Sequence, residues 1–290
     1  MIPGSFDYHV PATLDEAIAL MVKLGDNAKI LAGGQSLIPA MRFRLAAPDN
    51  LVDINRIPEL SKVEERGGFL VIGALVREHQ LDESELVAKS YPLLHDTSLV
   101  IADPIVRNQA TVGGNLAHAD PANDHPATML AYDAQVIARG PKGTRTIAID
   151  DFFVGLFENS LAPGEILTEI RIPKPGAGAG GAYIKIERKV GDYAVAAVAV
   201  QLTLTAGKVS AIRIGLTNVA AVPMRAKQAE SALLGKAPDD AALTAAALAA
   251  AAECDPSQDL RGNVDYKRDL VRVLTKRAVK KALARAGGAK

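Results

Sequence analysis

Two glycine pairs with polar neighbours are the strongest chemical signal in this sequence. Gly33 and Gly34 lie in "LAGGQS", and Gly113 and Gly114 lie further along the chain in "TVGGN". Glycine permits positive φ and lets backbone N–H groups come close to a phosphate, so we expect both features here. A tight turn would explain one such pair. The repeated pattern predicts two sides of a single diphosphate site.

The residues expected to form this site all lie in or beside the glycine pairs. They are Ala32, Gly33, Gly34, Gln35 and Ser36 in a first loop, and Thr111, Val112, Gly113, Gly114 and Asn115 in a second. Ser36, Thr111 and Asn115 contribute polar side chains to these loops. The sequence lacks the G-x-x-x-x-G-K-[ST] pattern of a P-loop, which argues against a nucleoside triphosphatase.

A third glycine-rich run, "GAGAGG", matches the spacing G-x-G-x-x-G at Gly176, Gly178 and Gly181. A dinucleotide-binding fingerprint must follow a strand and begin a helix. This run instead follows Pro173 and Pro175 and precedes a segment with the pattern of a strand. We therefore interpret it as a linker between two domains.

The segment after the second glycine pair concentrates ionisable side chains. They are His118, Asp120, Asp124 and His125. Imidazole and carboxylate groups can bind a metal ion, but the spacing is not that of H-E-x-x-H, and two prolines indicate a loop. We predict no metal site and expect Asp124 to accept hydrogen bonds from a ligand. A metal cluster and a merely solvated loop are the alternatives.

Charge and composition exclude several classes of partner. The chain has 33 Lys plus Arg and 33 Asp plus Glu, so no overall field attracts nucleic acid. Its single cysteine, Cys254, can neither form an internal disulfide nor hold an iron–sulfur cluster. Neither a signal peptide nor an apolar run of about twenty residues occurs. We expect a cytoplasmic protein without a transmembrane segment.

The patterning predicts a mixed α+β chain. A capping box of Thr13 and Glu16 begins a helix that ends before Gly25. Strands are expected in "AKILAGG", "NLVDINRIP", "FLVIGALV", "AQVIARGPKGTRTIAID" and "EILTEIRIP". Pro92 is expected to separate two helices. Beyond the linker, "AYIKIERKV", "VAAVAVQLTLT" and "KVSAIRIGLTNV" predict a three-stranded antiparallel sheet, followed by two helices.

Three stretches together carry a family resemblance: "LAGGQSLIPAMRFRLAAPDNLVDI", "TVGGNLAHADPANDHPA" and "RKVGDYAVAAVAV". The chain resembles the flavoprotein medium subunits of aerobic carbon monoxide dehydrogenases and, more widely, the FAD subunits of the xanthine dehydrogenase family. The resemblance spans nearly the whole chain. It implies a two-lobed FAD-binding domain of the vanillyl-alcohol oxidase (PCMH) type over residues 1–176, split near residue 57, and a small C-terminal α+β domain over residues 177–290.

The resemblance also implies roles for individual residues. The two glycine loops would hold the diphosphate of a noncovalently bound FAD, and Asp124 would contact its adenosine half. Leu167 and Lys185 match further FAD-lining positions, and Tyr193 in "GDYA" matches an aromatic residue near the isoalloxazine ring. Without the resemblance, Tyr193 would be interpreted as a half-buried aromatic residue of a strand. The flavin performs the chemistry, so no catalytic residue is expected.

The implied partners are a large subunit with a molybdenum cofactor and a small subunit with [2Fe–2S] clusters, assembled as a dimer of heterotrimers. This chain would receive electrons from the clusters and pass them through FAD to an external acceptor. The complex would be cytoplasmic, with peripheral membrane association as an option. The basic segment "KRAVKKALARAGGAK" would be a solvated helix face or a surface that binds a partner.

One departure from the resemblance concerns the substrate. Carbon monoxide dehydrogenases tend to have histidine in the first glycine loop, where Gln35 stands here. The substrate therefore stays open among carbon monoxide, a purine, an aldehyde and an N-heterocycle, and so does the acceptor. Two other functions remain as alternatives: a self-sufficient FAD oxidase or reductase, and a non-catalytic nucleotide-binding module.

Overall fold

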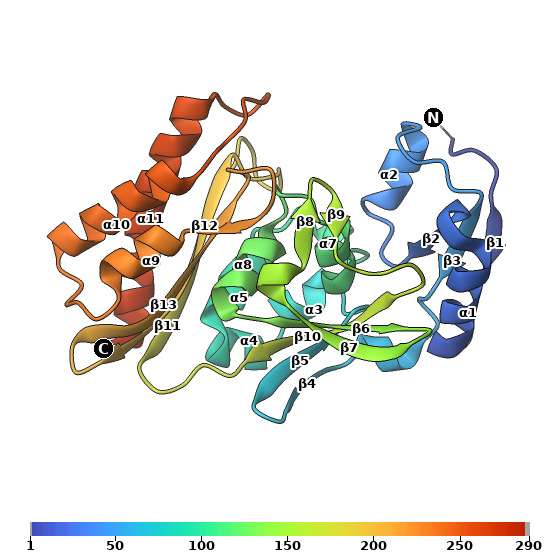
Figure 1. The fold of residues 1–290 in the computed structure, drawn as a ribbon, viewed down its shortest axis with the longest axis horizontal. Helices are drawn as coiled ribbons and strands as arrows, with labels where there is room; N and C mark the ends of the chain where they lie inside the picture. The colour runs from blue at the N-terminus through green and yellow to red at the C-terminus, as the bar shows by residue number, and fades with distance from the viewer. Residues whose placement is uncertain (1, 288–290) are drawn as a thin grey trace.

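The structure is a computed structural model that describes residues 2–287. Three sheets with their helices follow one another along the longest axis of the molecule (Figure 1). The parallel sheet of the N-terminal lobe comes first, a five-stranded sheet lies in the middle, and the C-terminal sheet is third. This arrangement agrees with the predicted α+β fold.

The N-terminal lobe is built on a parallel sheet in the order β1-β3-β2. Its strands are β1 (Asp7–His9), β2 (Ala28–Leu31) and β3 (Asn50–Asp53), and its helices are α1 (Leu14–Leu24) and α2 (Leu37–Arg42). The predicted start of α1 is confirmed, because the Thr13 hydroxyl accepts a hydrogen bond from the Glu16 N–H at 3.2 Å. Gly25, with φ of 57°, ends this helix as predicted.

The second lobe has an antiparallel sheet in the order β4-β5-β10-β6-β7. These strands are β4 (Val63–Arg66), β5 (Phe69–Gly73), β6 (Gln135–Gly140), β7 (Gly143–Ala148) and β10 (Ile166–Pro173), and a small hairpin adds β8 (Phe153–Gly155) and β9 (Glu158–Asn159). Its helices are α3 (Glu78–Asp82), α4 (Glu85–Ser90), α5 (Pro92–Ser98), α6 (Pro104–Arg107), α7 (Val112–His118) and α8 (Asp124–Tyr132). Pro92 begins α5, which confirms the predicted break between α4 and α5.

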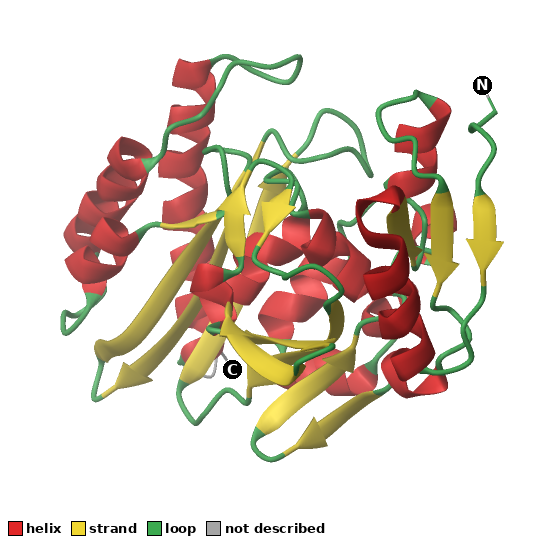
Figure 2. Ribbon diagram, turned by 45° about the vertical axis from the view of Figure 1, so that its right-hand side comes forward, coloured by secondary structure: helices red, strands yellow, loops and turns green. Residues whose placement is uncertain are grey.

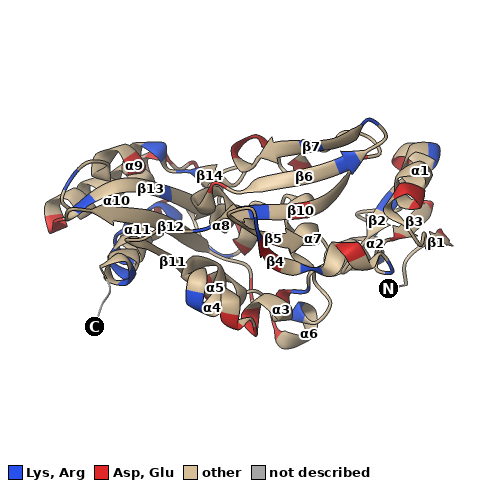
Figure 3. Cartoon of the chain, turned by 90° about the horizontal axis from the view of Figure 1, so that it is seen from below, with Lys and Arg blue, Asp and Glu red and all other residues tan. Residues whose placement is uncertain are grey.

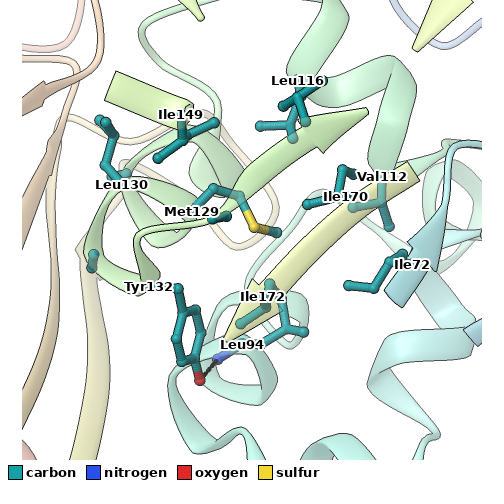
Figure 4. Close-up of a cluster of buried hydrophobic side chains, with 14 of the residues drawn as sticks. Ile72, Leu94, Val112, Leu116, Met129, Leu130, Tyr132, Ile149, Ile170 and Ile172 are labelled. Atoms are coloured by element: carbon teal, nitrogen blue, oxygen red, sulfur yellow. Dashed lines mark hydrogen bonds between the residues drawn. The ribbon is translucent and has the colours of Figure 1, made fainter. Parts of the chain in front are cut away.

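A buried apolar cluster holds α7 and α8 on this sheet (Figure 4). Ile72 and Ile170 come from the sheet, Val112 and Leu116 from α7, and Met129 from α8, and all five side chains are fully buried. Burying one such side chain contributes about 1.5–3 kcal/mol. The second glycine pair lies in the first turn of α7, so this core fixes its position.

The C-terminal sheet has the order β11-β12-β13-β14 and is antiparallel. Its strands are β11 (Ala179–Ile186), β12 (Ala196–Thr205), β13 (Lys208–Thr217) and the short β14 (Met224–Arg225), and its helices are α9 (Lys227–Leu233), α10 (Asp240–Glu253) and α11 (Val264–Ala286). The three predicted strands are confirmed, and β14 adds a two-residue edge strand. Helices α10 and α11 lie on the outer side of the sheet, and α5 and α8 of the second lobe lie on the other side (Figures 1 and 2).

The run "GAGAGG" is only partly a linker, which corrects the prediction. Ala179, Gly180 and Gly181 already belong to β11. A Cβ placed on Gly180 would lie 2.1 Å from the carbonyl oxygen of Ala282 in α11. The glycine is therefore needed because helix and strand backbones approach closely there.

Charged residues of both signs are spread over all parts of the fold in Figure 3, as expected from the balanced composition. Among residues 2–287, no helix is long and apolar enough to cross a membrane.

An ion pair joins α5 of the second lobe to α11 of the C-terminal domain. Asp96 accepts hydrogen bonds from both terminal nitrogens of Arg285, at 2.7 and 2.9 Å, and one from the Tyr183 N–H at 3.1 Å. Lys281 lies 2.9 Å from the same carboxylate. Burial acts to raise the pKa of Asp96, but these donors outweigh burial and hold the pKa below its ordinary value.

Replacing Asp96 with Asn is expected to lower the free energy of unfolding by about 1.5–3 kcal/mol at pH 7, the usual scale for hydrogen bonds to a charged group. The lowered pKa of Asp96 means that its carboxylate stabilises the fold at pH values above 3.8, the ordinary pKa. This stabilisation is lost as the pH falls through the lowered pKa. The difference between wild type and Asp96→Asn should therefore shrink in acid. Urea unfolding at pH 7 and at pH values below 4 measures it.

Asp269→Asn is the matched control, because Asp269 pairs with Arg272 on the exposed side of α11. We expect it to change the stability by at most about 1 kcal/mol. If the difference in free energy of unfolding between wild type and Asp96→Asn stayed constant from pH 7 to below pH 4, the ion pair would not be its cause.

Candidate cofactor-binding site

The first glycine loop joins β2 to α2. Gly34 has φ of 73°, a conformation that favours glycine. Within the described residues, the backbone N–H groups of Gly33, Gly34, Gln35 and Ser36 donate no hydrogen bond to another part of the chain. The loop therefore presents several unpaired donors next to one another, which is the arrangement that binds an anion such as a diphosphate.

The second glycine loop begins α7, and its backbone N–H groups are already hydrogen-bonded within the protein. Gly113 donates to the carbonyl of Ala74 at 3.1 Å, Gly114 donates to the Thr111 hydroxyl at 3.2 Å, and Asn115 donates to the Thr111 carbonyl at 2.9 Å. The expectation that both loops present backbone donors is thus wrong for these N–H groups. This loop offers side chains instead. The Asn115 Oδ1 atom is buried and has no partner among the described residues.

The expectation of positive φ is also wrong for three of the four glycines. Only Gly34 has it, and the other three are required by close contacts. A Cβ on Gly113 would lie 2.6 Å from the Ala74 Cα, and one on Gly114 would lie 2.6 Å from the Thr111 Oγ1. The sequence pattern identified the glycines, but the neighbours that require them come from the fold.

The two loops meet although they belong to different lobes. A Cβ placed on Gly33 would lie 2.4 Å from the carbonyl oxygen of Gln109 and 3.0 Å from the backbone nitrogen of Thr111. The first loop therefore packs directly on the residues that lead into the second. The unpaired donors of the first loop therefore lie next to the residues that begin the second loop.

Asp124 and Lys185, both predicted to line the site, form a buried ion pair. The Asp124 Oδ2 accepts from the Lys185 ammonium at 3.0 Å, and Oδ1 accepts from the Tyr183 hydroxyl at 2.5 Å. Lys185 also donates to the carbonyl of Val100 at 2.9 Å. Burial raises the pKa of the Asp124 carboxyl, and the Lys185 charge and the Tyr183 hydrogen bond oppose this rise.

Asp124 lies in the first turn of α8 and not in a loop, because a proline is tolerated in the first turn of a helix. The adjacent His125 is fully buried, and its Nε2 lies 2.7 Å from the Glu78 Oε2 in α3. His125 of α8 thus pairs with Glu78 of α3 in the protein core. Among residues 2–287, no group of three or more His, Cys, Asp and Glu side chains could hold a metal ion.

Tyr193 lies in the loop between β11 and β12, so the alternative of a strand position is wrong. The residue is 41% exposed, and the Arg261 guanidinium lies 5.4 Å from its ring centroid. Arg261 also forms an ion pair with Asp192 at 2.9 Å. Burial and the negative charge of Asp120 raise the pKa of Tyr193.

Leu167 occupies β10 and is 4% exposed. It belongs to the same buried cluster as Val112 and Leu116 of α7. Four further residues of this region were missed from the sequence: Asn55, Arg77, Tyr183 and Arg261. Isolated polar residues without a glycine or cysteine pattern gave no signal for them.

The two lobes, the glycine loops between them and the appended sheet define a class, the FAD-binding flavoproteins with a separate C-terminal domain. Profiles described as "FAD binding domain in molybdopterin dehydrogenase" and "CO dehydrogenase flavoprotein C-terminal domain" match residues 4–175 and 181–282. The chain belongs to this family of molybdopterin dehydrogenase flavoproteins.

Named relatives agree with that membership over nearly their whole length. The chain is 47% identical to the carbon monoxide dehydrogenase medium chain of Hydrogenophaga pseudoflava, covering 98% of this chain and 99% of the relative. It is 38% identical to the 6-hydroxypseudooxynicotine dehydrogenase complex subunit alpha of Paenarthrobacter nicotinovorans, covering 99% and 97%.

Solved structures give the same result. The carbon monoxide dehydrogenase structure from H. pseudoflava that lacks the Mo-pyranopterin moiety matches with a TM-score of 0.96 and 49% identity, over 98% of this chain and 99% of that chain. Quinoline 2-oxidoreductase from Pseudomonas putida 86 matches with a TM-score of 0.92 and 34% identity, over 100% and 99%.

Proposed function

We propose that this chain is the FAD-binding electron-transfer subunit of a molybdenum hydroxylase complex. It passes electrons from a partner's [2Fe–2S] clusters through FAD to an external acceptor. The observation that carries the proposal is the contact between two glycine loops, one of which presents unpaired backbone donors, in a chain of this flavoprotein family. FAD supplies the redox chemistry when bound, and the protein holds and orients it.

The residues present fit such a cofactor. The free N–H groups of residues 33–36 suit the diphosphate, and the unpartnered Oδ1 of Asn115 supplies an acceptor beside it. We assign Asp124 to the adenosine half of FAD, Leu167 and Lys185 to further positions that line the FAD site, and Tyr193 to the isoalloxazine ring. The proposed division is a FAD-binding part over residues 1–176, with lobes split near residue 57, and a C-terminal part over residues 177–290.

The proposed partners are a large subunit with a molybdenum cofactor and a small subunit with [2Fe–2S] clusters, arranged as a dimer of heterotrimers in the cytoplasm. Relatives are named as a "medium chain" and a "complex subunit", which supports assembly with other chains. The single cysteine of this chain supports placing the clusters in a partner.

In our proposal, a partner subunit and not this chain determines the substrate of the complex. Relatives that align over almost their full length are named for carbon monoxide, glyceraldehyde and caffeine, at identities of 47%, 36% and 32%. One flavoprotein architecture thus occurs in enzymes with chemically unrelated substrates. This supports a relay role that is common to all of them.

The relay is tested by replacing Tyr193 with Ala in the assembled complex. An aromatic contact is worth only about 0.5–1.5 kcal/mol beyond its buried area, so most of the flavin should stay bound. We expect a changed rate of electron delivery to the acceptor, while substrate oxidation at the metal, measured in a single turnover, stays nearly unchanged. Stopped-flow absorbance follows the two half-reactions separately.

Leu260→Ala is the control, because this side chain is 92% exposed and lies in the segment that carries Arg261. It should leave both half-reactions unchanged. If Tyr193→Ala slowed the metal-centred half-reaction equally in a correctly assembled complex, this chain would help to build the substrate site. Turnover by the chain without partners would instead make it a self-sufficient flavoenzyme.

A further inference from the structure

We propose that Asn55 and Arg77 act together as a clamp that sets the spacing of the two glycine loops, and are therefore positioning residues for FAD. The inference rests on the proposed function, because it assumes that the loops bind the cofactor. Neither residue belongs to a glycine loop. Asn55 follows β3 in the N-terminal lobe, and Arg77 precedes α3 in the second lobe.

Asn55 holds the first loop from the side of the N-terminal lobe. Its Nδ2 donates to the carbonyl oxygen of Ala32, the first residue of that loop, at 2.8 Å. The same nitrogen donates to the Asp53 Oδ1 at 2.7 Å, and the Asn55 backbone N–H donates to that oxygen at 2.8 Å. Asp53 is itself fixed, because the Tyr8 hydroxyl donates to its other carboxylate oxygen. The amide of Asn55 thus has one fixed orientation.

Arg77 connects this amide to the second loop. Its Nη2 donates to the Asn55 Oδ1 at 2.6 Å, and its Nη1 donates to the carbonyl oxygen of Gln109. The backbone of Arg77 also forms a β-bridge with Thr111, which caps α7. One planar guanidinium therefore bridges the two lobes through two donors in a fixed geometry, which a lysine cannot reproduce.

The clamp lies at the place where the two loops touch, and the backbone of Gly33 packs directly on the backbone of Gln109 there. Gly33 faces the Gln109 carbonyl so closely that even a Cβ would not fit, and Arg77 binds that same carbonyl. The hydrogen bonds of Asn55 and Arg77 therefore fix both ends of the contact, at Ala32 and at Gln109. The clamp thereby sets the spacing between the unpaired N–H groups of the first loop and the start of the second loop.

The test uses Asn55→Ala and Arg77→Met in the full chain, in the form from which FAD can be removed and added back. We expect FAD to bind about 10- to 100-fold more weakly, since a small misplacement of contact groups has effects of this size. Flavin fluorescence titration gives the affinity. Unfolding temperatures with and without FAD give the stabilisation that FAD binding adds, which is smaller in the variants if the clamp positions the loops.

Two further variants separate positioning from general support of the fold. Arg77→Lys keeps the charge but should still bind FAD more weakly than wild type. Arg66→Met is the matched control. Arg66 of the edge strand β4 also bridges two acceptors, Glu64 of β4 at 3.1 Å and Glu169 of β10 at 3.0 Å. It should leave the FAD affinity within about twofold, as is usual for an exposed ion pair.

The double variant should be no worse than the more damaging single one, because the two residues act as one unit. The clamp is overturned if both single variants bind FAD as wild type does, or if they lower only the stability of the FAD-free protein and keep the full FAD-induced shift. Failure of the wild-type chain to bind FAD in any form would instead remove the proposed function.

Discussion

Replacing Gly33 with Ala is expected to weaken FAD binding by about 5- to 150-fold, which corresponds to about 1–3 kcal/mol of overpacking. The added Cβ would lie 2.4 Å from the Gln109 carbonyl oxygen and 2.8 Å from the Ala110 Cα. Both atoms belong to backbone, so neither can move by rotating a side chain. The first loop must move away from the second, and the diphosphate site opens. Isothermal titration of the FAD-free protein measures the affinity.

Gly176→Ala is the control for this change. Nothing lies within 4 Å of a Cβ at Gly176, and its φ is not positive, so the same added methyl group should be neutral. A Gly33→Ala protein with wild-type FAD affinity would show that the contact between the loops does not define the site. A parallel loss in both variants would point to a general effect on folding.

Replacing Lys185 with Met is expected to lower the free energy of unfolding of the FAD-free protein by about 3–5 kcal/mol at pH 7, because the change leaves the Asp124 carboxylate buried without its countercharge. The Lys185 side chain is 2% exposed and that of Asp124 is 7% exposed, so solvent cannot replace the lost partner. Urea unfolding followed by circular dichroism measures this effect. We also expect weaker FAD binding, since both residues are assigned to the site.

The pH dependence has a definite sign. Burial raises the pKa of Asp124 in the folded protein. The protonated carboxyl therefore stabilises the fold fully below pH 3.8, the ordinary pKa. This stabilisation is lost as the pH rises through the raised pKa. Loss of the Lys185 charge raises this pKa further. The deficit of Lys185→Met should therefore be small in acid and grow toward neutral pH.

The double variant Asp124→Asn with Lys185→Met is the decisive comparison. It removes both charges, so it should recover much of the stability lost by Lys185→Met while FAD binding stays weak. Asp124→Ala alone is expected to weaken FAD binding by about 1.5–3 kcal/mol, the scale for a charged acceptor. Unchanged FAD affinity in Asp124→Ala with an intact fold would remove Asp124 from the site.

Local features of the fold could be predicted because they depend on neighbours in the sequence. The cap at Thr13, the break at Pro92 and the three long C-terminal strands follow from side-chain types at fixed spacing, and the structure confirms them. The family was also evident, because its motifs are contiguous runs of residues. Short elements such as β14 and α9 carry too few residues for a periodic pattern, so they could not be predicted from the sequence.

The site was only partly predictable because its contacts join distant segments. The glycine pairs were visible, but the sequence could not show that Gly33 packs on Gln109. Nor could it show that the N–H group of Gly113 is already bound to the carbonyl of Ala74. The pairing of Asp124 with Lys185 and Tyr183 depends on how β11 crosses the start of α8.

By itself, the sequence determined which residue types are available for a flavin site: the glycines, the polar side chains beside them and the absence of ligands for a cluster. The tertiary structure alone decided what each of them does. Asn55 and Arg77 have no sequence signature, and their contact exists only because the packing of two lobes brings β3 and α3 together. Hydrogen bonds between such segments depend on distances of a few ångströms, which the packing of the cores sets and the local sequence does not.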